Sequence, residues 1–87
     1  MLNRLTAKDG DGCYAVAGGD IEKALQKLGV FEDAYEDLMN SQEQIPRELA
    51  ALRAQGKEKT VWYRETMARK LINNGIAAFF ERHGLKG

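Results

Sequence analysis

The chain has 87 residues, 44% of them hydrophobic and 30% charged, which is enough to fold but leaves room for only one small domain. Thirteen basic and thirteen acidic residues cancel to a net charge of zero, whereas a nucleic-acid-binding domain usually carries a basic excess. No apolar run approaches the roughly 18 residues of a membrane span, and a single cysteine is typical of a reducing cytoplasm, where we expect this protein.

Residues 1–19 predict a short N-terminal β-hairpin or loop. Two partly apolar runs flank Asp9-Gly10-Asp11-Gly12, and Asp-Gly pairs supply the positive φ that tight turns need. The spacing of Asp9, Asp11 and Asp20 also resembles a calcium-binding loop. However, Tyr14 stands where that loop needs glycine, and Asp20 stands where it needs a bidentate glutamate. We therefore expect a plain turn and no metal.

Residues 20–55 predict a long helix, with Asp20 as its N-cap and Gly56 directly after its end. Its apolar residues recur at alternating steps of three and four, a heptad pattern that suits packing along one neighbouring helix. We call this set the heptad seam: Ile21, Ala24, Leu28, Phe31, Tyr35, Leu38, Gln42, Ile45, Leu49 and Leu52. Pro46 removes a backbone donor, so we expect a kink or a very short break near residues 41–46.

Residues 60–83 predict a second helix that begins after the N-cap Thr60 and ends at His83-Gly84. A break at Asn73-Asn74-Gly75 is compatible with this pattern. The face expected to pack against the first helix consists of Val61, Ala68, Leu71, Ile72, Ile76, Phe79 and Phe80, with Tyr63 and Met67 beside it.

These elements predict a mainly α fold, an antiparallel helical hairpin or small helical bundle in a single domain spanning residues 1–87. Two helices alone cover only one face of each other. Either the first arm folds at Pro46 into a third helix or two chains pair, and we favour the homodimer.

Charge is unevenly distributed along the chain. Residues 1–44 hold four basic and nine acidic residues, a net charge of −5, and residues 45–87 hold nine basic and four acidic residues, a net charge of +5. The two halves can complement each other within one chain or across a dimer, or they can steer a charged partner.

Two charged clusters are candidate binding surfaces. The acidic one, Glu32, Asp33, Glu36 and Asp37, can oppose arginines on a protein partner; the alternative is a solvated face. The basic one interleaves cations with aromatic rings, as surfaces that track a phosphate backbone and stack bases do. Its alternative is that the tryptophan caps the hairpin core while the charges are solvated. The basic cluster consists of Lys57, Lys59, Trp62, Arg64, Arg69 and Lys70.

Catalytic chemistry has no support in the sequence. Cys13 and His83 are the only cysteine and the only histidine, and they lie far apart along the chain. A thiolate nucleophile needs a base within reach, and a zinc site needs three or four ligands. We therefore predict a non-enzymatic protein with no cofactor, no metal site and no catalytic residue.

Several segments of the chain resemble parts of small proteins carried by prophages and mobile elements of Firmicutes. The resemblance lies in Asn3-Arg4-Leu5-Thr6, the Asp-Gly turn with Tyr14, and the runs 24–28, 31–38, 52–57, 70–74 and 79–85. None of these is a motif with assigned chemistry, so no functional residue carries over. The resemblance implies a phage accessory protein, a class that includes anti-CRISPR inhibitors of host defence nucleases.

This implied role leaves three hypotheses open. The first is an inhibitor that binds a host protein, such as a CRISPR effector, through the acidic residues. The second is a nucleic-acid-binding accessory factor that uses the basic cluster. The third is a structural phage oligomer built by pairing the heptad seam.

Overall fold

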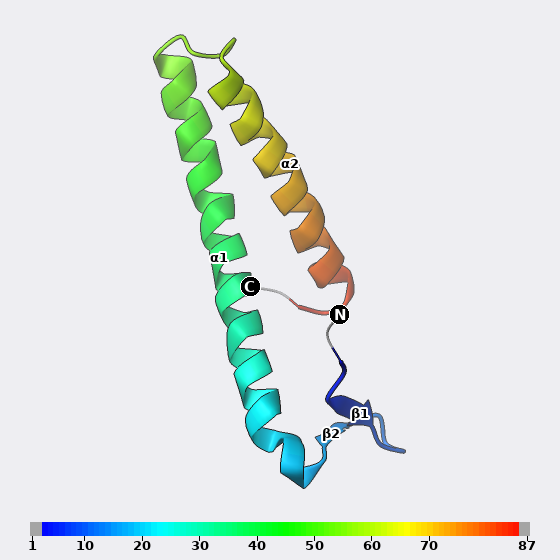
Figure 1. Cartoon of the computed structure of the whole chain (residues 1–87). Helices are drawn as coiled ribbons and strands as arrows, with labels where there is room; N and C mark the ends of the chain where they lie inside the picture. The colour runs from blue at the N-terminus through cyan, green and yellow to red at the C-terminus, as the bar shows by residue number, and fades with distance from the viewer. Residues whose placement is uncertain (1–2, 86–87) are drawn as a thin grey trace. The chain divides into compact units, whose positions relative to one another are not determined.

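The structure, a computed structural model, describes residues 3–85, so residues 1–2 of the predicted N-terminal segment and residues 86–87 lie outside it. The order of elements is β1 (Thr6–Lys8), β2 (Tyr14–Val16), a 3-10 turn (Gly18–Asp20), α1 (Ile21–Ala54) and α2 (Val61–Arg82) (Figure 1). This confirms the predicted mainly α fold with its N-terminal hairpin. The chain divides into two compact units, Met1–Ala34 and Tyr35–Gly87, and α1 runs through both.

In the first unit, β1 and β2 form a two-stranded antiparallel sheet that pairs Thr6 with Val16 and Lys8 with Tyr14. The turn between them is organised by Asp9, whose Oδ1 accepts hydrogen bonds from the backbone N–H groups of Asp11 (2.9 Å) and Cys13 (3.0 Å). Gly12 adopts a φ of 81°, which an L-residue rarely tolerates. The predicted turn between the two runs is confirmed, and the carboxylate of Asp9 accepts hydrogen bonds from its backbone.

The start of α1 differs in detail from the prediction. Gly18–Asp20 already forms a helical turn, and the residue before it is Ala17, whose side chain cannot cap a helix. Asp20 therefore ends this 3-10 turn and is not the N-cap of a helix that begins after it. Its carboxylate still lies at the positive end of the α1 dipole, where negative charge is favourable.

No break interrupts α1 near residues 41–46, so of the two expected alternatives, a kink or a very short break, the break is wrong, and Pro46 lies inside the helix. Pro46 costs the helix the hydrogen bond that would end on the carbonyl of Gln42. Ile45 and Leu49, on either side of it, are each only 1% exposed. Their packing holds the backbone helical across the proline.

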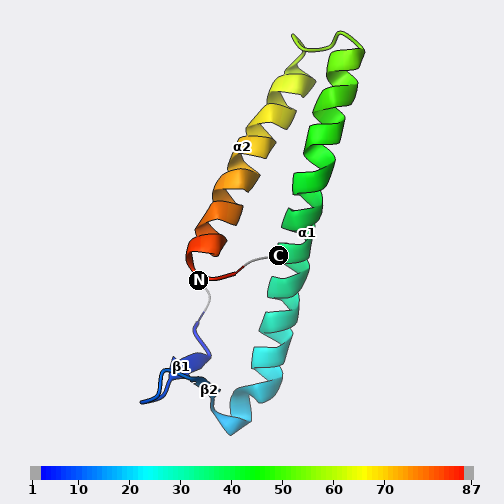
Figure 2. The same cartoon turned by 180° about the vertical axis from the view of Figure 1, so that it is seen from behind.

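The second unit is a helical hairpin in which α2 runs antiparallel to residues 35–54 of α1 (Figures 1 and 2). Contacts between the two helices fix its register from the loop outward. Arg53 Nε donates to Tyr63 Oη (2.8 Å), Arg69 Nη1 lies 3.8 Å from Glu48 Oε2, and Gln42 Nε2 donates to Asn74 Oδ1 (3.2 Å). At the far end, the rings of Tyr35 and Phe80 meet edge to face at 5.9 Å.

The ends of the helices follow the predicted signals. After α1, Gly56 has a φ of 71°, its N–H donates to Arg53 O, and the N–H of Lys57 donates to Leu52 O. This is a Schellman motif, and glycine is the residue that adopts its left-handed position most easily. Gly84 closes α2 in the same way, with a φ of 87°. Thr60 caps the start of α2, since its Oγ1 accepts the N–H of Tyr63.

The core of the hairpin is small. Of the residues that the structure describes, only three hydrophobic side chains are buried: Ile45, Leu49 and Leu52. Thr66 of α2 is buried with them, and its hydroxyl donates to the carbonyl of Trp62 (2.9 Å), so the polar group is satisfied without a partner on α1. The heptad seam is thus confirmed where α1 faces α2.

The predicted packing face of α2 is wrong. Of its seven residues only Phe80 is partly buried; the other six are exposed. The residues of α2 that lose exposure are Tyr63, Thr66, Met67, Lys70, Asn73, Ala77 and Phe80. α2 therefore turns its more polar side to α1 and leaves its more apolar side outward. The break that the sequence pattern allows at Asn73-Asn74-Gly75 is also absent, and Asn74 instead bonds to Gln42.

Candidate interaction surfaces

The four acidic residues of the predicted binding stripe are all exposed on α1. Glu32 and Asp33 belong to the first unit and Glu36 and Asp37 to the second. Among residues 3–85 the one ion pair is Arg69 with Glu48, so none of these four carboxylates has a cation within 4 Å. Neighbouring carboxylates without counter-charges form a surface that attracts a basic partner.

The basic cluster is brought together only in part. Lys57 Nζ lies 5.6 Å from the centre of the Trp62 ring, and Trp62 is 56% exposed. The alternative that Trp62 caps the hairpin core is therefore wrong. A cation held over an exposed indole face presents both groups to solvent at the loop end of the hairpin.

The remaining members of that cluster point in different directions. Arg69, two turns beyond Trp62, lies on the same side of α2 but is paired with Glu48. Arg64 lies about 200° around the helix from Trp62, and Lys70 is partly buried on the side that faces α1. Lys59 is exposed in the loop. The patch that the hairpin offers is therefore Lys57, Lys59 and Trp62.

The outward side of α2 is an exposed apolar surface of the second unit, although the sequence predicts that it packs against α1. We call it the outer α2 face: Val61, Ala68, Leu71, Ile72, Gly75, Ile76 and Phe79. Leu71 is 67% exposed, more than any other large hydrophobic residue that the structure describes. Exposed apolar side chains clustered on one helix face mark an interaction surface.

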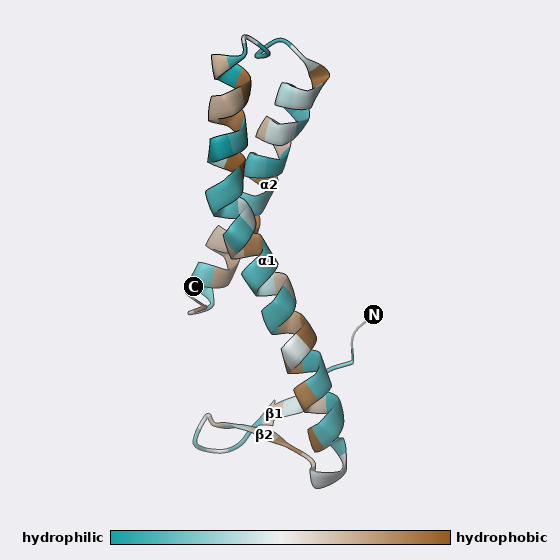
Figure 3. Ribbon diagram, turned by 90° about the vertical axis from the view of Figure 1, so that its left-hand side faces the viewer, coloured by the Kyte–Doolittle hydropathy of each residue, from teal (hydrophilic) through white to brown (hydrophobic). Residues whose placement is uncertain are grey.

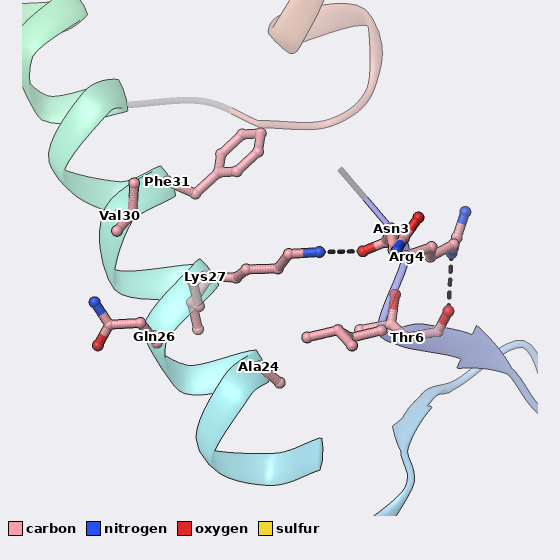
Figure 4. Close-up of a pocket in the computed structure, with 10 residues that line it drawn as sticks. Asn3, Arg4, Thr6, Ala24, Gln26, Lys27, Val30 and Phe31 are labelled. Carbon is pink, nitrogen blue, oxygen red and sulfur yellow. Dashed lines mark hydrogen bonds between the residues drawn. The ribbon is translucent and has the colours of Figure 1, made fainter. Parts of the chain in front are cut away.

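A groove of about 540 Å³ lies in the first unit between the N-terminal segment and the first turns of α1. In Figure 4 Lys27 reaches across it and donates to the carbonyl of Asn3, while Ala24 and Phe31 point toward the N-terminal segment. Arg4 Nε donates to Thr6 O at its edge. The groove is open and its walls are mainly apolar. In Figure 3, brown bands mark hydrophobic residues along this part of α1.

Residues with reactive or metal-binding side chains do not gather. Cys13 is exposed in the β-hairpin turn, and the ring of His83 lies 4.9 Å from that of Phe79 at the end of α2. Within residues 3–85, no group of three or more His, Cys, Asp or Glu side chains is placed to hold a metal ion. In the same range, no helix is both long and apolar enough to cross a membrane.

Comparisons with known proteins identify no relative: no family model, no curated protein and no solved structure matches the chain. The interpretation of its surfaces therefore depends on the geometry described above.

Proposed function

We propose that this chain is a non-enzymatic binding protein that acts on another protein through the exposed carboxylates Glu32, Asp33, Glu36 and Asp37. One observation carries the proposal: these carboxylates lie on successive turns of α1 without a counter-charge in residues 3–85. These carboxylates can therefore bind arginines of a partner without first breaking an ion pair within residues 3–85. Arginine–carboxylate pairs are among the stronger polar contacts.

The partner best suited to such a surface is a protein that normally holds nucleic acid. Its lysines and arginines are spaced to meet phosphates, and a row of carboxylates on a helix presents negative charge to the same groups. Together with the resemblance to prophage proteins, this favours an inhibitor of a host defence nuclease of the anti-CRISPR type. Such an inhibitor would compete with DNA or RNA and would act at a one-to-one ratio with its target.

The test is a DNA-cleavage assay with purified CRISPR effectors, each loaded with guide RNA and given a matching duplex. We expect the protein to abolish cleavage by at least one effector and a variant with all four residues as amides (E32Q, D33N, E36Q and D37N) to lose that inhibition. The matched control removes the same four charges elsewhere on the surface: D11N, E22Q, E58Q and E81Q. Equal loss in both variants, or retention in both, contradicts the role of the acidic stripe. Full cleavage by every effector contradicts the inhibitor.

A second function, binding of single-stranded nucleic acid at the hairpin loop, is favoured by the exposure of Trp62 beneath Lys57. Base stacking on an exposed indole contributes about 1–3 kcal/mol per base. Fluorescence anisotropy with a labelled oligonucleotide at low salt tests it. A Trp62→Ala variant should lose binding, whereas Tyr14→Ala, an exposed ring with Lys8 at 5.4 Å, should not. Identical behaviour of the two variants, or no binding by the intact protein, argues against this function.

A further inference from the structure

The outer α2 face is the starting point for an inference independent of the proposed function, which uses α1. We propose that this face pairs with the same face of a second copy of the chain, in an antiparallel arrangement that turns two hairpins into a four-helix bundle. Three features of the second unit support a second copy as the occupant.

The first feature is the size of the core. Ile45, Leu49 and Leu52 are the only hydrophobic side chains buried in residues 3–85. A core of this size is small for a domain of 87 residues, and chains in this position usually gain stability from disulfides, metals or oligomerisation. Cys13 is the single cysteine, so no disulfide within the chain adds to this core, whereas covering the outer α2 face with another chain would bury more apolar surface. A partner needed to complete the fold must be present whenever the chain is made, and a second copy meets that condition.

The second feature is the distribution of charge along the hairpin. Its loop end, residues 45–70, holds seven basic and three acidic residues, a net charge of +4. Its open end, residues 35–44 and 71–85, holds four acidic residues and one basic residue, a net charge of −3. Because the helices are antiparallel, these charges lie at opposite ends of one hairpin and do not neutralise each other across it. Two hairpins packed antiparallel set the basic end of each beside the acidic end of the other.

The third feature is the symmetry of the outer α2 face itself. Ala68, Ile72, Gly75 and Phe79 follow steps of four, three and four, which is a heptad spacing; the seam position before them is occupied by the exposed Glu65, so the apolar part of the seam begins at Ala68. Its two small residues, Ala68 and Gly75, lie equally far on either side of the Leu71–Ile72 bond. In an antiparallel pair with its two-fold axis at that bond, Ala68 of one copy therefore faces Gly75 of the other. Small residues opposite each other let two helices approach closely, and the wider residues Ile72 and Phe79 fill the spaces between them.

The oligomeric state is the first measurement. Light scattering coupled to size exclusion should give twice the chain mass of 9.7 kDa for the intact protein. Ile72→Glu and Leu71→Glu should give the single-chain mass, because a carboxylate in the seam must be desolvated. Leu25→Glu is the matched control: Leu25 is a leucine of α1 with 63% exposure, close to that of Leu71. A single-chain mass for the intact protein overturns the proposal. So does dissociation by Leu25→Glu with retention of the dimer in both α2 variants.

Cross-linking tests the arrangement without a charge in the seam, so it remains informative if the glutamate variants fail to fold. In a Cys13→Ser background, Ala68→Cys and Gly75→Cys chains are made separately, then mixed and oxidised. The antiparallel register predicts a disulfide between one Ala68→Cys chain and one Gly75→Cys chain. Equivalent residues of two copies would be about 10 Å apart along the axis, too far for a disulfide. Disulfides formed mainly between identical chains would overturn the antiparallel arrangement, and absence of any cross-link would overturn the interface.

Discussion

The two ends of α1 carry the same heptad seam but bury it very differently. In Tyr35–Gly87 the seam residues Ile45, Leu49 and Leu52 are 1–2% exposed, whereas in Met1–Ala34 Leu28 is 56% exposed. The difference follows from length: 34 residues of α1 extend about 51 Å and 22 residues of α2 about 33 Å. A heptad seam indicates which side of a helix is suited to packing. The length of the neighbouring helix determines how much of the seam is buried.

The largest effect that tests this comparison is expected from truncating a leucine in each region. Leu49→Ala should lower the free energy of unfolding by about 3 kcal/mol, because it leaves a cavity in the small core. Leu28→Ala should lower it by less than about 1 kcal/mol, as at most exposed sites. Urea unfolding followed by circular dichroism measures both. Similar losses from the two substitutions would mean that the exposed half of the seam is buried by something in solution.

Hydrogen exchange tests the comparison without any substitution. Amides of residues 25–33 of α1 should exchange at least about tenfold faster than those of residues 42–52, a difference of about 1.4 kcal/mol in local opening. The physical reason is that opening the first segment exposes little apolar surface that is not exposed already. Both segments belong to one helix, so each is the control for the other. Uniform protection along α1 would show that the helix opens as one unit.

Two glycines test the backbone of α1 and of the turn after it. We expect their substitution by alanine to change the free energy of unfolding in opposite directions. Gly29 lies inside α1 with open space where a Cβ would stand, so Gly29→Ala should raise the free energy of unfolding by about 1 kcal/mol. Gly56 also has open space, but its φ of 71° makes Gly56→Ala unfavourable by about 1 kcal/mol. Thermal unfolding of both variants checks the pair. A change of the same sign in both would contradict this account of either position.

Local rules explain what could be predicted from the sequence. Gly56, Thr60 and Gly84 act through the backbone of their own neighbours, and each ends or begins a helix as predicted. The heptad seam of α1 is one-sided, so its packed side was identified correctly between Tyr35 and Leu52.

The choice of face on α2 could not be predicted in the same way, because both sides of that helix carry a regular pattern. The outer side is richer in large apolar residues, and hydrophobicity alone selects it. The side that faces α1 includes Thr66, Lys70 and Asn73, whose polarity hides an equally regular spacing. The regular spacing of these residues, considered without regard to their polarity, was the signal in the sequence that could have identified the packed side of α2. The same rotation of α2 places Trp62 at the surface, which no property of the tryptophan alone predicts.

The smallest expected effect concerns polar contacts within the packed unit. Arg53 and Arg69 both reach across the hairpin, but by different means. Arg53 Nε donates to Tyr63 Oη at 2.8 Å and its guanidinium lies 5.7 Å from that ring's centre. Arg69 Nη1 lies 3.8 Å from Glu48 Oε2, beyond hydrogen-bonding distance, and both side chains are about half exposed.

We therefore expect a coupling energy below about 0.5 kcal/mol for Arg69 with Glu48. The pair has no hydrogen bond, and although Glu48 Oε2 itself is buried, the Arg69 side chain is 55% exposed, so water screens its charge. The coupling of Arg53 with the hydroxyl of Tyr63 should be about 1 kcal/mol, since a hydrogen bond of 2.8 Å joins them. Double-mutant cycles with Arg69→Ala and Glu48→Ala, and with Arg53→Ala and Tyr63→Phe, give the two values. The Tyr63→Phe cycle keeps the ring and so isolates the hydrogen bond. If Arg69 proved the more strongly coupled, charge rather than the leucine core would be setting the register of the hairpin.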